Sequence, residues 1–333
     1  MHININLSKK ILSWYDNNKR SLPWRVSKRS KKKLYYRLLS EFMLQQTQVK
    51  TVIPYFNKFI KKYKTLKSLS KCNEREILKM WEGLGYYRRA RHLLASAQKL
   101  VKEHKSILPK TLEEVKRLPG VGEYTANALL GLVYDHPTIA IDGNVKRVLA
   151  RNINKEEKKI NFKKLITFNK KILFITNRNA DFVEALMEFG ALICKPKEPK
   201  CIICCLNKSC KYFKSSNKIE TTSKRMIKNK DYDIFCYINK KKQIALTKKN
   251  QVGFLKNFNL PTIKATNGFS ANKNWNFLKK YKNSISNLKL NINLYYKFSN
   301  KIPKNYDWYS LENNKEFIPS FTKKIFRQVS TLF

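Results

Sequence analysis

Four cysteines lie close together in the chain, and cysteine thiolates bind metals. They are Cys194, Cys201, Cys204 and Cys210, with the spacing C-x6-C-x2-C-x5-C. Four thiolates within one short segment can surround a metal centre without ligands from elsewhere in the chain. Structural zinc sites usually have two close pairs joined by a longer loop, whereas this segment has one close pair flanked by single cysteines. The spacing therefore favours an iron–sulfur cluster and leaves zinc as the alternative.

Two carboxylates stand where acid–base chemistry is possible. Glu41 is flanked by apolar residues of an expected helix, where burial raises the pKa of a carboxyl group and keeps its proton near neutral pH. Asp142 comes directly before Gly143 and another helical pattern. Each also has a plain structural interpretation, as a surface glutamate and as a helix N-cap. As a pair they meet the needs of glycosidic bond cleavage, in which one group protonates the leaving group and the other stabilises a positively charged sugar.

A glycine-rich turn precedes a helical pattern in the string Leu118-Pro119-Gly120-Val121-Gly122. A Gly-x-Gly turn that opens into a helix presents backbone N–H groups at the positive end of the helix dipole. Such groups bind phosphate without regard to base sequence. We therefore take Gly120, Val121 and Gly122 as candidate phosphate contacts, although a Gly-x-Gly by itself is common in ordinary turns.

A second turn carries an aromatic residue. Gly83 and Gly85 flank Leu84, and Tyr86 and Tyr87 follow. An aromatic side chain at a glycine-flanked turn is suited to insertion between stacked bases. Tyr86 taken alone has an equally simple interpretation as a core tyrosine.

The elements that must position these residues fall into two regions. Residues 1–213 are expected to be mainly helical, because their apolar residues recur at helical spacing. Residues 214–228 are polar and basic, which is typical of a linker. Residues 229–333 contain alternating apolar positions, for example from Leu288 to Leu294, and these predict strands. A closing helix is expected at about 321–332.

The net charge of the chain is strongly positive. Its 333 residues include 70 Lys and Arg against 23 Asp and Glu, a formal net charge of +47. A surface this basic attracts polyanions, nucleic acid first and an acidic membrane second, although drift in composition toward Lys, Asn and Ile accounts equally well for much of the excess. No apolar run predicts a membrane-spanning helix, and the first residues do not resemble an export signal. We therefore expect a cytoplasmic protein whose clustered cysteines bind metal.

The hairpin and the cysteines resemble parts of one known superfamily. The string 118–122, followed by Glu123-Tyr124-Thr125-Ala126, resembles the helix–hairpin–helix motif of DNA glycosylases. The cysteine spacing resembles the cluster loop of the endonuclease III and MutY families. This resemblance implies one 4Fe–4S cluster bound by the four cysteines, with the neighbouring Cys205 outside the ligand set.

The strings around the two carboxylates resemble the MutY family. This resemblance implies that Glu41 is the catalytic acid and Asp142 the aspartate that stabilises the sugar, with Asn144 as a hydrogen-bonding partner and Tyr124 as a support. Relatives of the endonuclease III type carry glutamine at the position of Glu41 and a Schiff-base-forming lysine at the position of Tyr124. The resemblance therefore implies a monofunctional enzyme that only hydrolyses the N-glycosidic bond.

Contacts with DNA are implied at Gln46 and at the wedge residue Tyr86. The C-terminal region resembles, more loosely, the Nudix-like domain that reads 8-oxoguanine in MutY, with a matching segment at 253–261. It lacks the glutamate-rich Nudix hydrolase box, so nucleotide hydrolysis is not expected. The family's Phe-Ser-His contact ends here in Ser299-Asn300, which keeps Ser299 as a DNA contact and leaves the lesion preference open.

Together these features predict a mainly α helix–hairpin–helix glycosylase domain joined by a linker to a smaller C-terminal α/β Nudix-like domain. The first domain spans 1–213, with the hairpin at about 116–130 and the cluster loop at 194–210; the second spans 229–333. The expected substrate is double-stranded DNA with adenine opposite 8-oxoguanine or guanine, bound by a monomer at the nucleoid. Two alternatives stay open: an endonuclease III-like glycosylase and abasic-site lyase, and a non-catalytic iron–sulfur DNA sensor.

Overall fold

The computed structural model describes residues 3–219, 228–250, 252, 254–266, 274–285, 288–310 and 317–333. Contacts within the chain divide it into a helical unit, Met1–Ser223, and a sheet-containing unit, Lys224–Phe333. Gly253, the first residue of the expected strand–loop motif, lies outside the described residues. No helix in the described part of the chain is long and apolar enough to cross a membrane.

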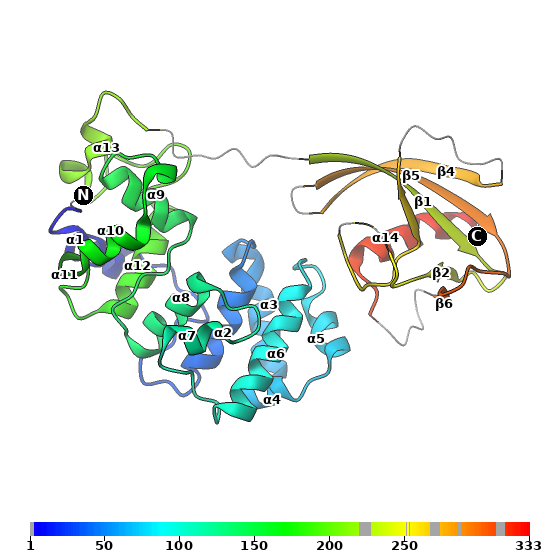
Figure 1. Ribbon diagram of the computed structural model, residues 1–333, viewed down its shortest axis with the longest axis horizontal. Helices are drawn as coiled ribbons and strands as arrows, with labels where there is room; N and C mark the ends of the chain where they lie inside the picture. Colours follow the sequence, from blue (N-terminus) through cyan, green and yellow to red (C-terminus); the bar gives the residue numbers. More distant parts are fainter. Residues whose placement is uncertain are drawn as a thin grey trace. The chain divides into compact units, whose positions relative to one another are not determined.

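One half of the helical unit is formed by the consecutive helices α2 to α8 (Figure 1). Several of them begin at side-chain caps: Thr65, Asn73 and Thr111 each accept a hydrogen bond from the backbone N–H three residues later. Helix α2 packs against α3, α6 and α8, and its residues Tyr35–Met43 are all buried. The helices are α2 (Lys33–Leu44), α3 (Val49–Lys62), α4 (Leu66–Ser70), α5 (Glu74–Trp81), α6 (Arg88–Glu103), α7 (Leu112–Lys116) and α8 (Glu123–Tyr134).

The other half joins the first helix of the chain to the helices after residue 142 (Figure 1). Helix α12 packs against α1, α8 and α9. One apolar core in this half extends from Ile3 and Leu7 near the N-terminus to Phe189 and Leu206. The elements are α1 (Leu7–Asn18), α9 (Gly143–Asn152), η1 (Glu157–Lys159), α10 (Phe162–Phe168), α11 (Lys170–Leu173), α12 (Asn179–Leu192), η2 (Asn207–Ser209) and α13 (Lys211–Lys214).

A buried network of charged side chains holds α12 against the N-terminal elements. Tyr15 donates a 2.6 Å hydrogen bond to Glu184, and Arg37 of α2 forms an ion pair with the same carboxylate. One turn later, Glu188 pairs with Arg20 at 2.7 Å. Burial opposes ionisation of Glu188, but the hydrogen bonds from Arg20 hold its pKa at about 2. The network therefore fixes α2 and α1 on one face of α12.

The sheet-containing unit is built on one sheet with the strand order β4-β5-β1-β2-β6, and β3 also pairs with β1. Strand β1 is parallel to β5 and antiparallel to β2 and β3. Alternate residues such as Ile234 and Ile292 enter a core that they share with Phe321 and Ile325 of the last helix. The elements are β1 (Lys228–Ile238), β2 (Ile244–Leu246), β3 (Thr262–Ala265), β4 (Asn276–Ile285), β5 (Leu288–Phe298), β6 (Asp307–Tyr309), α14 (Ser320–Val329) and η3 (Ser330–Leu332).

Candidate active site

Glu41 lies near the end of α2, and only 5% of the residue is exposed. Burial favours the neutral acid and raises the pKa of Glu41 to about 7. A hydrogen bond with Tyr124 and the charge of Arg37 oppose this rise in pKa, and the nearby carboxylates of Asp142 and Glu184 add to it. Glu41 therefore keeps a proton near neutral pH and can give it to a leaving group.

Asp142 is the N-cap residue of α9. One of its carboxylate oxygens accepts a 2.7 Å hydrogen bond from the backbone N–H of Val145, and the other accepts a 2.9 Å bond from the side-chain amide of Asn144. Burial raises the pKa of Asp142, while these two bonds lower it. Asn144 in turn accepts a 2.7 Å bond from Arg147, which orients its N–H group toward Asp142. The same carboxylate thus caps a helix and belongs to the site.

Tyr124 brings the two carboxylates into one site. Burial raises the pKa of its phenol, and the charges of Glu41 and Asp142 raise it further. Its hydroxyl group hydrogen-bonds with Glu41 and lies 3.4 Å from the sulfur of Met187 on α12. The structure therefore brings together Glu41 from α2, Tyr124 from α8, and Asp142 and Asn144 from the start of α9. These are the four residues expected to be catalytic.

The two residues expected to contact the base pair, Gln46 and Tyr86, both stand on turns with a left-handed backbone. Their φ angles are 59° and 48°. Gln46 is exposed, and Tyr86 is 41% exposed. A positive φ is uncommon for residues that carry a side chain, and it persists where the surrounding structure enforces it.

The turn between α7 and α8 is tightly built around its first glycine. Gly120 has a φ of 75°, and a Cβ atom there would lie 2.4 Å from the ring of His92. The N–H group of Val121 donates to the carbonyl of Leu118 at 3.1 Å, so this amide is used within the turn. The other backbone N–H groups of this candidate site belong to Gly120, Gly122 and the first turn of α8, whose N-cap Gly122 provides no side-chain cap.

The four cysteines of the cluster loop line one hollow together with Arg151 and Tyr212. Arg151 directs an N–H group at the sulfur of Cys194 at 3.5 Å, and the backbone N–H of Leu206 lies 3.4 Å from the sulfur of Cys204. Donors aimed at cysteine sulfur favour the thiolate form. Across the described residues, no group of three or more His, Cys, Asp or Glu side chains is placed to hold a single metal ion.

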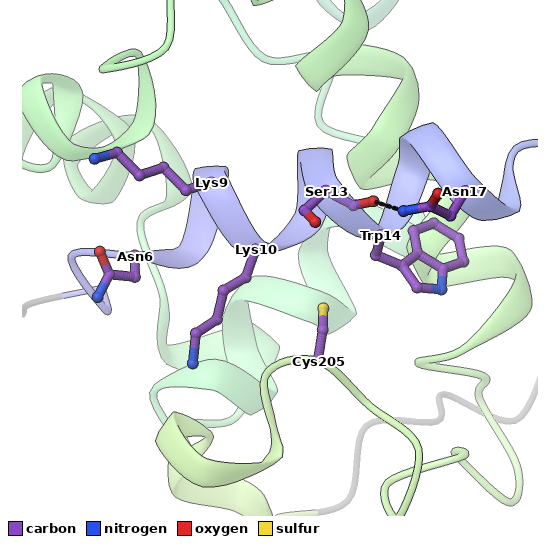
Figure 2. A pocket seen from close by; sticks show the side chains of 7 residues that line it. All are labelled: Asn6, Lys9, Lys10, Ser13, Trp14, Asn17 and Cys205. Atoms are coloured by element: carbon purple, nitrogen blue, oxygen red, sulfur yellow. Dashed lines mark hydrogen bonds between the residues drawn. The ribbon is translucent and has the colours of Figure 1, made fainter.

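Cys205 lines a different hollow, on the side of α1 (Figure 2). Its side chain points toward α1, where Lys10 and Trp14 lie. The other four cysteines line the hollow beside Arg151 instead. This separation supports a ligand set that does not include Cys205.

Comparison with known proteins identifies the family. A model of the HhH-GPD superfamily of base excision DNA repair proteins matches residues 39–168. An adenine DNA glycosylase from Buchnera aphidicola subsp. Baizongia pistaciae is 36% identical, over 91% of this chain and 90% of its own length. The chain belongs to the MutY family of adenine DNA glycosylases. The human adenine DNA glycosylase is 38% identical over 60% of this chain and 38% of its own length.

Solved structures share the fold of the helical part. A thermostable thymine-DNA glycosylase matches with a TM-score of 0.56 and 28% identity, over 62% of this chain and 95% of that one. Endonuclease III, trapped in a covalent intermediate with DNA, matches with a TM-score of 0.53 and 21% identity over 64% and 98% of the two chains. This adenine DNA glycosylase is thus a DNA N-glycosylase with the HhH-GPD fold, and DNA is its partner.

Sequence reasoning missed the basic residues that surround the glycosylase site. Arg147 donates to the carbonyl of Cys194 at 2.7 Å and to that of Gly190 at 2.8 Å. Because it also binds Asn144, it connects the start of α9 with the start of the cluster loop. The available signal was the pair Arg147 and Arg151, which lie four residues apart and therefore share one face of α9.

Ser299 belongs to the sheet-containing unit, at the end of β5. Its backbone N–H donates to the carbonyl of Ile238 at 2.9 Å, and its hydroxyl group donates to the carbonyl of Lys301 at 2.7 Å. The next residue, Asn300, is exposed. Ser299 therefore belongs to a different unit from Glu41 and Asp142.

Proposed function

We propose that this adenine DNA glycosylase excises adenine opposite 8-oxoguanine or guanine and leaves the DNA strand intact. The observation that carries the proposal is the pairing of Glu41, a buried acid with a raised pKa, with Asp142, a carboxylate held by amide donors. Glu41 is suited to protonate the departing adenine. Asp142 is suited to stabilise positive charge on the deoxyribose.

The two alternatives make different demands on this site. An endonuclease III-like lyase needs an amine nucleophile, whereas Tyr124, which hydrogen-bonds with Glu41, is a phenol and cannot form a Schiff base. A non-catalytic sensor needs neither a protonated Glu41 nor a charge-stabilising Asp142. The convergence of these three side chains supports hydrolysis of the N-glycosidic bond.

The product of the reaction tests this proposal. A duplex with adenine opposite 8-oxoguanine should yield an intact strand with an abasic site, which breaks only after hot alkali. A denaturing gel run with and without alkali measures this, and a duplex with adenine opposite thymine is the control that should stay whole. Efficient trapping of a covalent amine adduct with borohydride would show lyase chemistry and contradict the proposal.

We further propose that the cluster loop holds one 4Fe–4S cluster. Its ligands would be Cys194, Cys201, Cys204 and Cys210, which line one hollow. Four thiolates without nitrogen or oxygen ligands are the donor set that a 4Fe–4S cluster takes. The donors from Arg151 and Leu206 suit thiolate ligands. When bound, the cluster would cross-link the loop, because the free energy of metal binding also stabilises the fold.

Two serine substitutions separate the proposed ligands from their neighbour. Cys201→Ser should lose iron and with it DNA binding or folding, whereas Cys205→Ser should keep the wild-type content of about four irons per chain. Metal analysis and visible absorption of anaerobically purified protein measure this. One zinc and no iron in the wild-type protein, or equal iron loss in both variants, would overturn the ligand assignment.

We propose that the sheet-containing unit is a Nudix-like domain that reads 8-oxoguanine through the end of β5. A chain truncated after Ser223 should still remove adenine opposite guanine in part, but should lose preference for 8-oxoguanine as the partner base. Single-turnover rates on the two duplexes measure this preference. Asn300→His, which restores the family residue, should raise it or leave it unchanged. If truncation lowers the rate equally on both duplexes, the unit only stabilises the enzyme and does not read 8-oxoguanine.

The chain is proposed to bind double-stranded DNA as a monomer and to act at the nucleoid. Part of its +47 net charge would serve contacts with phosphate, which weaken as the salt concentration rises.

A further inference from the structure

Arg89, in the first turn of α6, has a buried guanidinium group. Only 7% of the residue is exposed, and the rings of Trp81 and Tyr86 lie 5.4 and 5.5 Å from the guanidinium carbon. Burial lowers the pKa of Arg89 to about 10, so the group stays charged at neutral pH. A buried charge is costly unless fixed partners surround it, and the identity of those partners points to its role.

One nitrogen of the guanidinium group serves the end of α2. Arg89 Nη1 donates to the carbonyl of Met43 at 2.7 Å, to that of Phe42 at 3.1 Å and to that of Gln45. The last carbonyls of a helix lack partners within the helix, and they form the negative end of its dipole. Arg89 therefore satisfies the end of α2 immediately before Gln46.

The other terminal nitrogen donates hydrogen bonds to the turn before α6 and also to the turn that follows α2. Arg89 Nη2 donates to the carbonyl of Leu84 at 3.0 Å and to that of Gly85 at 3.2 Å. It also donates to the hydroxyl group of Thr47 at 3.0 Å. Gly85 directly precedes Tyr86. One planar guanidinium group therefore binds the backbone beside Gln46 and the backbone beside Tyr86.

We infer that Arg89 is a positioning residue that holds the turns of Gln46 and Tyr86 in a fixed relation, so that Tyr86 enters the base stack and Gln46 contacts the base pair together as adenine is extruded. The inference rests on the proposed DNA-binding roles of those two residues. Each turn contains a left-handed residue, a conformation that persists only when its surroundings over-determine it. The rigid fork of an arginine can do this for two turns at once, because the N–H groups of its two terminal nitrogens have fixed directions.

Arg89→Lys tests the inference, because lysine keeps the positive charge but lacks the planar fork. Thr47→Val is a milder variant that removes one acceptor and keeps the side-chain shape. Arg178→Lys is the matched control: it makes the same chemical change at an exposed guanidinium that forks onto Asp16, outside both turns. The substrates are a duplex with adenine opposite 8-oxoguanine and a duplex with adenine opposite an abasic-site analogue, where adenine is already unpaired.

Extruding a paired base costs more free energy than extruding an unpaired one. Displacement of Tyr86 and Gln46 should therefore slow adenine release most in the paired duplex. We expect Arg89→Lys to slow single-turnover release from the paired duplex by about 10–100-fold, and from the unpaired duplex by less than about 10-fold. Thr47→Val should show a smaller effect of the same kind, and Arg178→Lys should show none. The fluorescence of 2-aminopurine beside the adenine should report slower extrusion in the same order.

Equal losses on both duplexes in Arg89→Lys and Thr47→Val would overturn the inference and leave Arg89 a purely structural role. If Arg89→Lys does not fold, Thr47→Val decides, because equal rates to the wild type on both duplexes would also overturn it. Failure of the proposed function would instead appear in the wild-type chain, as release of adenine that does not depend on the partner base.

Discussion

Replacing Glu41 with glutamine should slow adenine release by about 10²–10⁴-fold, the usual contribution of a general acid, while duplex binding stays near the wild-type level. Glutamine keeps the shape of the side chain and can still bond with Tyr124, but it has no proton to give to adenine. Because Glu41 is buried as a neutral acid at its raised pKa, a neutral amide should be accommodated without a large loss of stability. Single-turnover kinetics and equilibrium DNA binding measure the two effects. Glu113→Gln, at a position with a 74% exposed side chain, is the control that should change neither.

The pH dependence of the reaction follows from the same carboxyl group. Glu41 can act as an acid only while protonated, and its pKa is raised from 4.5 to about 7. The rate should therefore fall as the pH rises through about 7, and this descending limb should be missing in Glu41→Gln. Asp142 must be ionised to stabilise the sugar, and burial raises its pKa above 3.8. The rate should therefore rise with pH through a midpoint above pH 3.8. A wild-type rate that stays constant through pH 7 would remove the acid role from Glu41.

Asp142→Asn should also abolish most turnover, by at least about 10²–10³-fold, because it removes the charge that stabilises the developing cation. Asparagine is as good an N-cap residue as aspartate, so the side-chain oxygen at position 142 should still accept a hydrogen bond from the N–H of Val145, and the protein should unfold at nearly the wild-type temperature. Turnover lost with stability and DNA binding retained would assign the effect to charge. Undiminished turnover would reopen the interpretation as a non-catalytic sensor.

A modified leaving group distinguishes the two carboxylates. An adenine analogue that departs without protonation no longer needs the acid, but it still needs stabilisation of the sugar. Such a substrate should partly restore the rate of Glu41→Gln and leave Asp142→Asn slow. Equal rescue of both variants is the outcome that is incompatible with separate roles on the base and on the sugar.

Periodic patterns predicted most of the secondary structure correctly. The alternation from Leu288 to Leu294 corresponds to part of β5, and the closing helix expected at 321–332 is α14 with its following 3-10 turn. These features depend on local periodicity and burial, which a sequence displays directly.

The partners of buried charges could not be predicted in the same way. Nothing in the sequence pairs Arg37 with Glu184 or directs Arg89 to the end of α2, because these contacts join residues that only the tertiary fold brings together. The turn of Gly120 shows a finer limit: its glycine pattern is visible in the sequence, but the use of the Val121 amide within the turn is not. Motifs thus identify residue types, and the fold decides which of their atoms are available.

The packing of α1 has a consequence for the nascent chain. Residues such as Leu7 and Ile11 are buried against Phe182 and Phe189, and the bond from Tyr15 to Glu184 spans 169 positions. At the usual rates of translation, about 10–30 seconds pass between synthesis of α1 and the arrival of these partners. During that interval the apolar stripe of α1 is open to chaperones or to wrong contacts, while α2 to α8 can already pack with near neighbours. Helix α1 is therefore synthesised well before the helix that buries it.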